Sequence, residues 1–464
     1  MIWLGTRIMN LCFHPPLLLR SSAVCLRLAS AATVYENLKC LNQYSTEFLS
    51  WLQHKAGLEI SSTLAVGNSI YGRSLFASDT IKAGDCILRV PYSVQISPEN
   101  IVPEIKVLLN DDLSNVAKLA AVLLAEQKMG QSSEWATYVN SLPRHGELHS
   151  TVFWSEDELE MIRQSPVYQE TICHQAKIES EYLKVRLVFE LFPQRFSGIS
   201  LEDFMHAYAL VASRAWGTSK GLSLIPFADF LNHDGLSGSV LLSDEDKRIS
   251  EVIADRDYAV GEEVFIRYGK YSNATLMLDF GFTLSHNIYD QVQIWMAVSE
   301  HDPLCAEKVE LLHKHSMPTI ICEKGGVNYH GNLFTIKEVR SARGTGKGIP
   351  QSLRAFARVL SMTFHQELDD LATEATQNDG RLARRPLGNK NREVESHRIL
   401  LLEITNMVRE YIASIKLLRK ESSHSIRRQM ASDLLTGELR VLKSASAWLM
   451  NYSALSPPSK LDLS

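Results

Sequence analysis

The polar triplet Asn232-His233-Asp234 ends an otherwise apolar stretch, residues 224–231, which carries a single acid, Asp229. An amide, an imidazole and a carboxylate make different hydrogen-bond demands, and polar groups that a fold buries need partners. The spacing places this triplet at the end of a segment that the chain buries. Either protein groups or a bound ligand can therefore satisfy Asn232 and His233.

Other short motifs do not support a nucleotide site, a hydrolase site or a metal site. The segment GTGKG at 344–348 lacks the spacing of a phosphate-binding loop, and no GxGxxG or GxSxG motif occurs. His313 and His315 have no acid or cysteine beside them to complete a ligand set. The seven cysteines form no CxxC pair, so we expect reduced thiols and no metal. The basic stretch 381–392 is typical of a solvated loop.

The composition is that of a globular protein, with 45% hydrophobic and 22% charged residues. The net charge of −5 gives no attraction to nucleic acid or to anionic membranes, so we expect neither as a partner. No apolar stretch approaches the roughly 18 residues of a membrane span.

The first 35 residues contain no acid but hold Arg7, Arg20 and Arg27. This pattern is typical of an organellar transit peptide, which we place at 1–32 and which predicts a chloroplast or mitochondrial location. A disordered N-terminus or a mis-assigned start codon is the alternative, and it would leave the protein in the cytoplasm or nucleus.

Hydrophobic periodicity divides the chain into alternating helical and strand-rich blocks. Helical spacing predicts helices at 36–57 and across 104–205, and short alternating segments with glycines predict strands at 58–97 and 224–300. Beyond 300 the pattern is mostly helical. Three local signals are specific: a helix should end at Gly130, Ser200 and Asp203 should form a capping box, and a hairpin should turn at Val260-Gly261.

Four motifs then occur in a fixed order along the chain: YGRSLFASDTIKAGDCILRVP (71–91), SRAW (213–216), LIPFADFLNHD (224–234) and GEEVFIRYGKYSNATLMLDFGF (261–282). Together they resemble the SET-domain protein methyltransferases, in the branch that includes the Rubisco large-subunit lysine methyltransferase. The C-terminal segments GIPQSLRAFARVL (348–360) and RRQMASDLLTGELRVLKSA (427–445) also resemble this branch.

The resemblance implies an α+β fold. A β-rich SET domain with a pseudoknot would span 33–290 and would be interrupted by the helical block at about 104–205. An all-α substrate-binding domain would follow at 291–464 and would dock the protein substrate.

The resemblance also implies that the chain binds S-adenosylmethionine. The expected cofactor-binding residues are Gly72, Arg73, Ser74, Leu75, Asp85, Cys86, Ile87, Arg214, Asp229, Asn232, His233 and Tyr268. Arg214 would contact the cofactor carboxylate, since a guanidinium forms charge-assisted bonds with that group. Ser74 stands where the family has a second glycine, and Asp85 where it often has Glu.

Tyr268 matches the family's catalytic tyrosine, and Phe280 and Phe282 would line the channel for the acceptor. Phe280 stands where the Rubisco enzyme has a second tyrosine, so the number of methyl groups added cannot be carried over. The expected activity is methylation of a lysine in a protein substrate. There are two alternatives. The acceptor could be a histidine, or the chain could be a non-catalytic SET-fold scaffold in an organellar protein or nucleic-acid complex.

Overall fold

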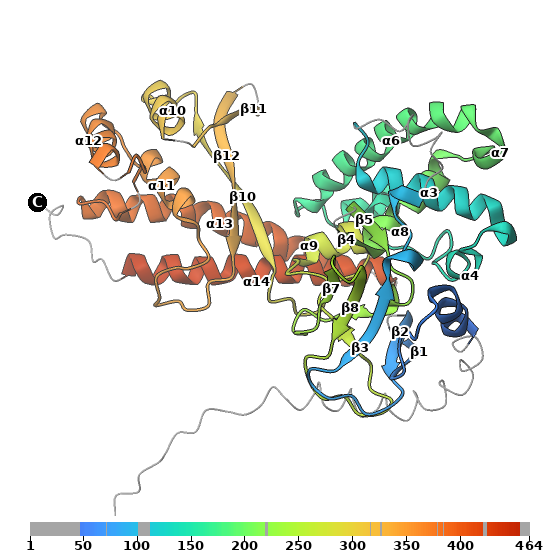
Figure 1. The fold of residues 1–464 in the computed structure, drawn as a ribbon. Helices are drawn as coiled ribbons and strands as arrows, with labels where there is room; N and C mark the ends of the chain where they lie inside the picture. Colours follow the sequence, from blue (N-terminus) through green and yellow to red (C-terminus); the bar gives the residue numbers. More distant parts are fainter. Residues whose placement is uncertain are drawn as a thin grey trace, which may run out of the picture. The chain divides into compact units, whose positions relative to one another are not determined.

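The computed structural model divides the chain into two compact units, and each unit draws on two separate stretches of sequence (Figure 1). Unit 1 comprises residues 1–95 and 225–267, and unit 2 comprises residues 96–224 and 268–464. The structure describes residues 47–70, 72–100, 112–218, 221–315, 317–324, 327–377, 379–383, 385–420 and 425–454. The expected transit peptide at 1–32 lies outside the described residues.

Unit 1 consists of short strands in three small sheets, with a helix at 47–56 before them. One sheet pairs β1 with β2 antiparallel, a second has the order β3-β8-β7, and a third pairs β6 with β9 in parallel. The bounds are β1 (Leu64–Ser69), β2 (Gly72–Ala77), β3 (Cys86–Pro91), β6 (Asn232–His233), β7 (Leu241–Asp244), β8 (Ile249–Ile253) and β9 (Phe265–Ile266), with 3₁₀ turns η1 (Tyr92–Val94) and η5 (Ala228–Phe230).

The prediction of a hairpin at Val260-Gly261 is wrong. A backbone turn does occur there, because Glu262 N–H donates to the Ala259 carbonyl. The flanking strands do not pair with each other, however: β8 pairs with β3 and β7, and β9 pairs with β6. A turn signal sets the local reversal, whereas the partner of each strand is set by contacts with distant segments.

The helical insert of unit 2 lies between residues 112 and 214 in the described chain. Its helices and turns are α3 (Asn115–Met129), η3 (Gly130–Ser132), α4 (Ala136–Val139), η4 (Thr151–Phe153), α5 (Glu156–Glu160), α6 (Val167–Leu191), α7 (Pro193–Phe196) and α8 (Leu201–Arg214). Before α3 comes η2 (Pro98–Asn100), and after α8 come β4 (Ala215–Thr218) and β5 (Gly221–Leu224).

Local capping signals are confirmed in this insert. Helix α3 stops at Gly130, which adopts a positive φ of 56° that a residue with a Cβ rarely takes. Ser200 and Asp203 form the expected capping box at the start of α8, since the Ser200 Oγ accepts the Asp203 N–H and the Asp203 carboxylate accepts the Ser200 N–H.

The region from 291 onward is not all-α as expected. It contains a three-stranded antiparallel sheet in the order β10-β12-β11, and β10 buries alternate residues along its whole length. The bounds are β10 (Gln291–Ser299), β11 (Ile320–Lys324) and β12 (Val327–Lys337). Strand β12 carries Gly331 and two asparagines, which weaken a strand pattern read from sequence alone. The mixed helix-and-strand class is nevertheless confirmed.

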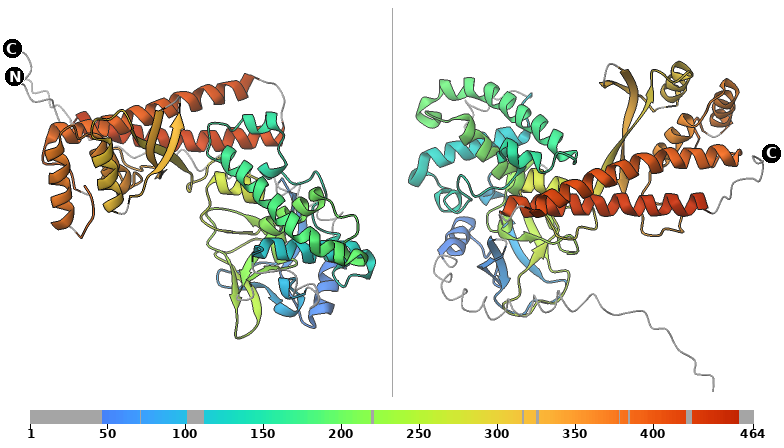
Figure 2. Two further views of the ribbon diagram at one scale, coloured as in Figure 1. Left: turned by 90° about the horizontal axis from the view of Figure 1, so that it is seen from above. Right: turned by 180° about the vertical axis from the view of Figure 1, so that it is seen from behind.

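Helices pack against one face of this sheet, and α13 and α14 form a long helical hairpin (Figures 1 and 2). The bounds are α9 (Asn273–Thr275), π-helix η6 (Leu276–Phe280), α10 (Cys305–Lys314), α11 (Gln351–Leu360), α12 (His365–Gln377), α13 (Lys390–Lys420) and α14 (Ile426–Ala454). One hydrophobic cluster joins the buried face of β10 to α11, α13 and α14. None of the described helices is long and apolar enough to cross a bilayer.

A buried ion pair and a single buried carboxyl group lie inside this helical core. Arg358 and Glu393 form a buried bidentate ion pair with N–O distances of 2.7 and 2.8 Å. Glu438 is fully buried on α14, where it accepts hydrogen bonds from Ser165 at 2.9 Å and from Tyr411 at 3.0 Å. Glu438 therefore connects the insert to both long helices.

Candidate functional site

In unit 1, strand β2 places the predicted cofactor turn beside the Asn-His segment. Ser74 lies on β2 with its side chain fully buried, and its Oγ has no hydrogen-bond partner among the described residues. The Arg73 guanidinium lies 5.1 Å from the centre of the Phe230 ring, a cation–π contact. Leu75 accepts the N–H of Val264 at 2.9 Å. Gly72 starts the strand with a φ of 96°.

Asn232 and His233 form β6, which pairs in parallel with β9. The Asn232 amide nitrogen donates to Glu263 at 3.1 Å and to Ser69 at 3.4 Å, so part of its demand is met by protein. His233 is buried, and burial lowers its pKa, which keeps the imidazole neutral at pH 7. Asp229 is buried on η5 a few residues earlier. The structure thus brings Gly72–Leu75, Asp229 and Asn232-His233 into one unit.

The backbone immediately before this segment is strained. Phe227 is fully buried with φ 74° and ψ −46°, close to the rare γ-turn region, and it stands at the start of η5. Such conformations cost about 1–3 kcal/mol and cluster at functional sites. The Phe227 ring packs against Phe230 with ring centroids 6.3 Å apart. No residue-type signal in the sequence marks this strain, because phenylalanine does not favour a positive φ.

Asp85, Cys86 and Ile87 have a different setting within unit 1. The exposed Asp85 carboxylate accepts the Lys82 N–H at 2.8 Å, which closes a turn. Cys86 pairs with Ile253 on β8. Ile87 is buried in the core. These contacts give the three residues local structural roles.

In unit 2, Tyr268 is surrounded by aromatic rings. Phe280 stacks on it with ring centroids 5.3 Å apart, while Trp216 and Phe282 present edges at 5.5 and 6.4 Å. Trp216 lies on β4, two residues after Arg214. The indole Nε1 of Trp216 is enclosed and has no hydrogen-bond partner among the described residues. Trp216 was not predicted as a site residue, although it stands in the SRAW motif.

The segment after Tyr268 holds Phe280 and Phe282 in place. It forms α9 and then η6, a π-helical turn of a kind that is frequent at functional sites. Gly281 ends η6 with a φ of 74°, and a Cβ there would lie 2.7 Å from the Ser150 backbone nitrogen. Buried Asn273 exchanges two hydrogen bonds of 2.9 Å with the Leu284 backbone. Only glycine fits between the two phenylalanines.

Carboxyl groups lie next to this aromatic cluster. Burial, and secondarily the charge of Glu170, raises the pKa of Asp279, the residue before Phe280. Burial also raises the pKa of Glu170 on α6, which accepts a hydrogen bond from Gln293 at 3.2 Å. Burial, with the charge of Glu181, raises the pKa of Tyr208 to about 12. Burial is the main cause of each shift, so this region disfavours additional negative charge.

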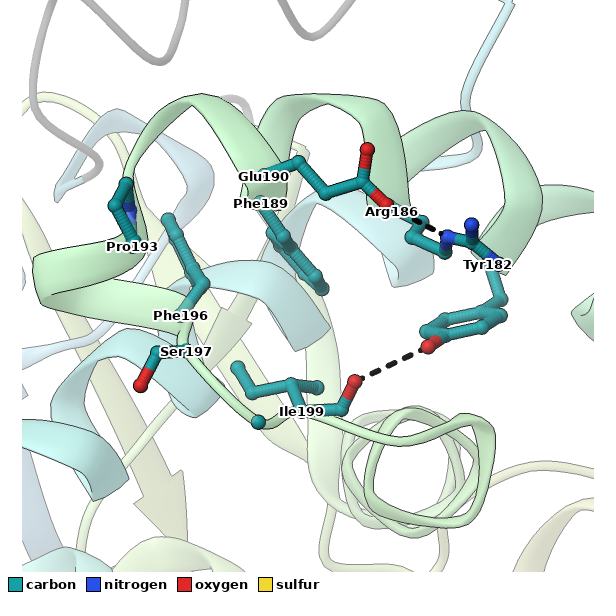
Figure 3. A pocket seen from close by; sticks show the side chains of 9 residues that line it. Tyr182, Arg186, Phe189, Glu190, Pro193, Phe196, Ser197 and Ile199 are labelled. Atoms are coloured by element: carbon teal, nitrogen blue, oxygen red, sulfur yellow. Dashed lines mark hydrogen bonds and ion pairs between the residues drawn. The ribbon is translucent and has the colours of Figure 1, made fainter.

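A separate cavity of about 440 Å³ lies between the C-terminal end of α6 and α7 (Figure 3). Its walls include Tyr182, Phe189, Phe196 and Ile199, and Arg186 and Glu190 form an ion pair at its edge. None of the predicted site residues lines it.

Two known families match the chain: the SET domain over residues 72–269 and Rubisco LSMT substrate-binding over residues 299–442. The chain therefore belongs to the SET-domain proteins of the branch that carries the Rubisco LSMT substrate-binding domain. This confirms the resemblance drawn from the four motifs.

Curated relatives are methyltransferases with different substrates. The chain is 28% identical to the chloroplastic [fructose-bisphosphate aldolase]-lysine N-methyltransferase of Arabidopsis thaliana, over 62% of this chain and 61% of that protein. It is 26% identical to the chloroplastic Rubisco large subunit N-methyltransferase of Pisum sativum, over 57% of this chain and 56% of that protein. It is 26% identical to the human actin-histidine N-methyltransferase, over 87% of this chain and 68% of that protein.

The fold is that of Rubisco LSMT. The structure of Rubisco LSMT bound to sinefungin and monomethyllysine matches with a TM-score of 0.70 at 22% identity, covering 89% of this chain and 92% of that chain. Rubisco LSMT bound to AdoMet matches with a TM-score of 0.68 over the same shares. The SET fold with a C-terminal substrate-binding region is thereby established. The match spans less than two thirds of the length of the first two curated relatives.

Proposed function

We propose that this chain is an S-adenosylmethionine-dependent methyltransferase that acts on a lysine side chain of a protein substrate. The observation that carries the proposal is the enclosure of Tyr268 by Trp216, Phe280 and Phe282. An apolar wall beside the Tyr268 hydroxyl suits a reaction that needs a desolvated, well-oriented amine. Family membership supports methyl transfer, and the curated lysine methyltransferases support the acceptor.

The described residues fit this cofactor. In unit 1, Ser74 Oγ is an enclosed polar atom without a partner among the described residues, and a polar ligand would satisfy it. We propose that Gly72–Leu75, Asp229 and Asn232-His233 hold the adenosyl and amino-acid parts, with Arg214 binding the carboxylate. We also propose that Asp85, Cys86 and Ile87 contact the cofactor, in addition to their local structural contacts. When bound, S-adenosylmethionine supplies an activated methyl group on a positively charged sulfur.

The chain's own residues would prepare the acceptor. A free lysine amine has a pKa near 10.4, so the ammonium must lose a proton before it can react. The rings of Phe280 and Phe282 exclude water, which disfavours the charged form. The Tyr268 hydroxyl would then hold the neutral amine in line by a hydrogen bond. A phenol is protonated at pH 7, so we assign Tyr268 to orientation and not to general-base catalysis.

Phe280 offers no hydroxyl, so the proposal does not extend to the number of methyl groups.

Histidine is the second candidate acceptor. The actin-histidine N-methyltransferase aligns with 87% of this chain, a larger share than the 62% and 57% of the two lysine enzymes. A neutral imidazole needs no prior deprotonation at pH 7, so the same aromatic enclosure would accept it.

The protein substrate would dock on the C-terminal domain. We propose a SET domain at 33–290 with its insert at about 104–205, and a substrate-binding domain at 291–464. An organellar location is proposed from the acid-free arginine-bearing segment at 1–32, and two of the lysine methyltransferase relatives are chloroplastic. Import of the tagged full chain into isolated chloroplasts and mitochondria, compared with the same chain from residue 33, would test the location.

The activity is tested by methyl transfer from radiolabelled S-adenosylmethionine to proteins of a hypomethylated organelle extract. We expect one labelled protein with the wild-type chain, no label with Tyr268→Phe or Asn232→Ala, and full label with Tyr182→Phe. Tyr182 is a matched control because its hydroxyl donates to the Ile199 carbonyl at 3.1 Å in the separate cavity. Hydrolysis of the labelled protein distinguishes methyl-lysine from methyl-histidine.

Three results would contradict parts of this proposal. If the label is found on methyl-histidine, the acceptor is histidine and not lysine. Cofactor binding without transfer to any extract, including one from cytosol, would favour a non-catalytic scaffold. Absence of cofactor binding would overturn the assignment of the unit 1 residues.

A further inference from the structure

The connection between β12 and α11 carries an unbalanced positive charge. Arg340, Arg343 and Lys347 lie on residues 340–348, which we call the basic loop, and all three side chains are exposed. No acid occurs from residue 339 to residue 366. The basic loop therefore presents three cations that no neighbouring acid in the sequence balances.

These three cations have no ion-pair partner among the described residues. Other cations of the same region are paired: Arg392 lies 2.7 Å from Glu367. The acid just before the basic loop, Glu338, is engaged by Arg440 with an N–O distance of 3.5 Å. The charges of the basic loop are thus open to an external anion.

The backbone of the basic loop is fixed against the C-terminal part of α14 (Figure 1). The Trp448 indole donates to the Gly344 carbonyl at 2.7 Å, and the Val339 N–H donates to Ser444 Oγ at 2.9 Å. Gly346 is buried with a φ of 67°, and a Cβ there would lie 2.6 Å from the Trp448 ring. A loop held in place before a partner arrives loses less conformational entropy on binding.

A fourth positive charge lies beneath the basic loop. The Arg354 guanidinium donates to the Thr345 carbonyl at 2.9 Å and to the Gly346 carbonyl at 2.6 Å, and it lies 4.6 Å from the centre of the Trp448 ring. Burial, together with the charge of Arg358, lowers the pKa of Arg354. No carboxylate of the described chain forms an ion pair with Arg354. A half-buried cation of this kind adds to the attraction for an anion.

An acidic protein segment fits this surface. Guanidinium groups bind carboxylates through paired, charge-assisted hydrogen bonds. The match to Rubisco LSMT substrate-binding, over residues 299–442, includes the basic loop. Since the whole chain has a net charge of −5, an acidic segment is attracted here more than elsewhere. The long backbone of a nucleic acid would meet that net negative charge over more of the surface than a short acidic segment.

We propose that the basic loop docks an acidic segment of the protein substrate, whose carboxylates bind Arg340, Arg343 and Lys347. The proposal rests on the methyltransferase function proposed above, and it adds the chemistry by which the substrate is recognised. Because these side chains are exposed, dissolved salt screens the attraction and weakens binding.

Binding of a labelled peptide tests the surface without any turnover. The probe is a fluorescein-labelled oligoglutamate, and an oligoglutamine of equal length is the neutral control; fluorescence anisotropy with the full chain gives the Kd. We expect oligoglutamate to bind at low salt, with a Kd that rises about tenfold or more between about 50 and 300 mM NaCl. Oligoglutamine should not bind at either salt concentration.

Removal of the charges tests the location. The triple variant Arg340→Ala, Arg343→Ala and Lys347→Ala should raise the Kd for oligoglutamate roughly tenfold, since each exposed ion pair contributes modestly and three are lost. Thermal unfolding should match that of the wild-type chain, because the three side chains are exposed and make no ion pair among the described residues.

A matched control removes two arginines and one lysine from α13. Arg409→Ala, Lys416→Ala and Arg419→Ala, all at exposed positions, should together leave the Kd within about twofold of wild type. The ring of His397, on the same helix, lies 5.6 Å from that of Trp448. Arg409 is 12 residues further along (409 − 397), which places the three control positions about 18 Å or more beyond this contact.

Methyl transfer tests whether the docked segment belongs to the substrate. In the labelled extract, the triple variant of the basic loop should transfer less label than wild type at low extract concentration and equal label at high concentration, because KM rises and kcat does not change. Oligoglutamate added to the wild-type reaction should compete with the substrate. The α13 control variant should behave as wild type.

Three results would overturn the proposal. An equal Kd for the two triple variants would show that the acidic peptide binds elsewhere. A single-stranded oligonucleotide that binds more tightly than oligoglutamate, and loses affinity in the basic-loop variant, would identify a nucleic-acid surface. A change in peptide binding without any change in methyl transfer would assign the surface to a partner other than the substrate. Absence of label with the wild-type chain would count against the proposed function and leave the peptide result to decide the surface.

Discussion

The buried Glu438 should make the folded protein less stable as the pH rises through neutrality. Burial raises the pKa of this carboxyl to about 8 from the ordinary 4.5, although hydrogen bonds from Ser165 and Tyr411 oppose the shift. The charge of Asp290 raises it further, and burial raises the pKa of Asp290 itself to about 6. At pH 7 Glu438 therefore carries a proton in the folded state.

The sign and size of the effect follow from proton linkage. Between pH 4.5 and pH 8 the folded state keeps a proton that the unfolded chain has released, so the free energy of unfolding falls as pH rises. From pH 4.5 to pH 7 the difference is 2.5 units, and at about 1.4 kcal/mol per unit this amounts to roughly 3 kcal/mol. The contribution is fully present below pH 4.5 and fully lost above about pH 8.

The substitution Glu438→Gln tests this directly. Glutamine has the same shape, and its amide can accept from Tyr411 and remain neutral at every pH. We expect the variant to be more stable than wild type at pH 7, by up to about 3 kcal/mol, and to show little advantage at pH 4.5. Urea unfolding followed by circular dichroism at pH 4.5, 6, 7 and 8 measures the difference. Glu410→Gln, an exposed residue on α13, is the matched control.

One pattern of results would refute the reasoning. If the free energy of unfolding of the wild-type chain does not fall from pH 4.5 to pH 8, and Glu438→Gln is less stable at every pH, then Glu438 is ionised in the folded protein. Its bonds to Ser165 and Tyr411 would then outweigh its burial.

Three further outcomes are expected. Gly281→Ala should lower the free energy of unfolding by about 3 kcal/mol, because its Cβ would lie 2.7 Å from the Ser150 nitrogen at a φ of 74°; unfolding in urea that matches wild type would show that the backbone can adjust. Glu393→Ala should cost about 3–5 kcal/mol in the same assay, since it leaves the Arg358 charge buried and unpaired, and a cost below about 1 kcal/mol would contradict this. Burial opposes the shift, but hydrogen bonds from Gly238, Tyr258 and Ser239 lower the pKa of Asp255. The ionised carboxylate therefore stabilises the fold above its unfolded pKa, and this stability should be lost as the pH falls through the lowered value. Asp255→Asn should lose less stability in acid than wild type, and an equal loss in both proteins would contradict the role of these hydrogen bonds.

Local signals in the sequence were sufficient for several features. Gly130 ends α3, and Ser200 with Asp203 starts α8, because caps depend on residues within one turn of the helix. The four ordered motifs were sufficient to predict the SET family and a SET domain that is split by a helical insert. The strict alternation of β10 lies within the strand-rich region expected up to 300.

Other features needed the tertiary structure because they depend on distant residues. The strands on either side of Val260-Gly261 find separate partners, and β11 and β12 complete a sheet where helices were expected. Trp216 lies against Tyr268, which is 52 positions away in the sequence (268 − 216), and no pattern of residue types indicates that contact.

The sequence by itself predicted which residues belong to the site, because chemistry requires particular side chains in motifs that can be recognised. Only the tertiary structure decided the features that depend on packing: the aromatic enclosure of Tyr268, the strained backbone at Phe227 and the burial of Glu438. Burial and strain arise from packing between segments that are remote in sequence, so no local pattern encodes them.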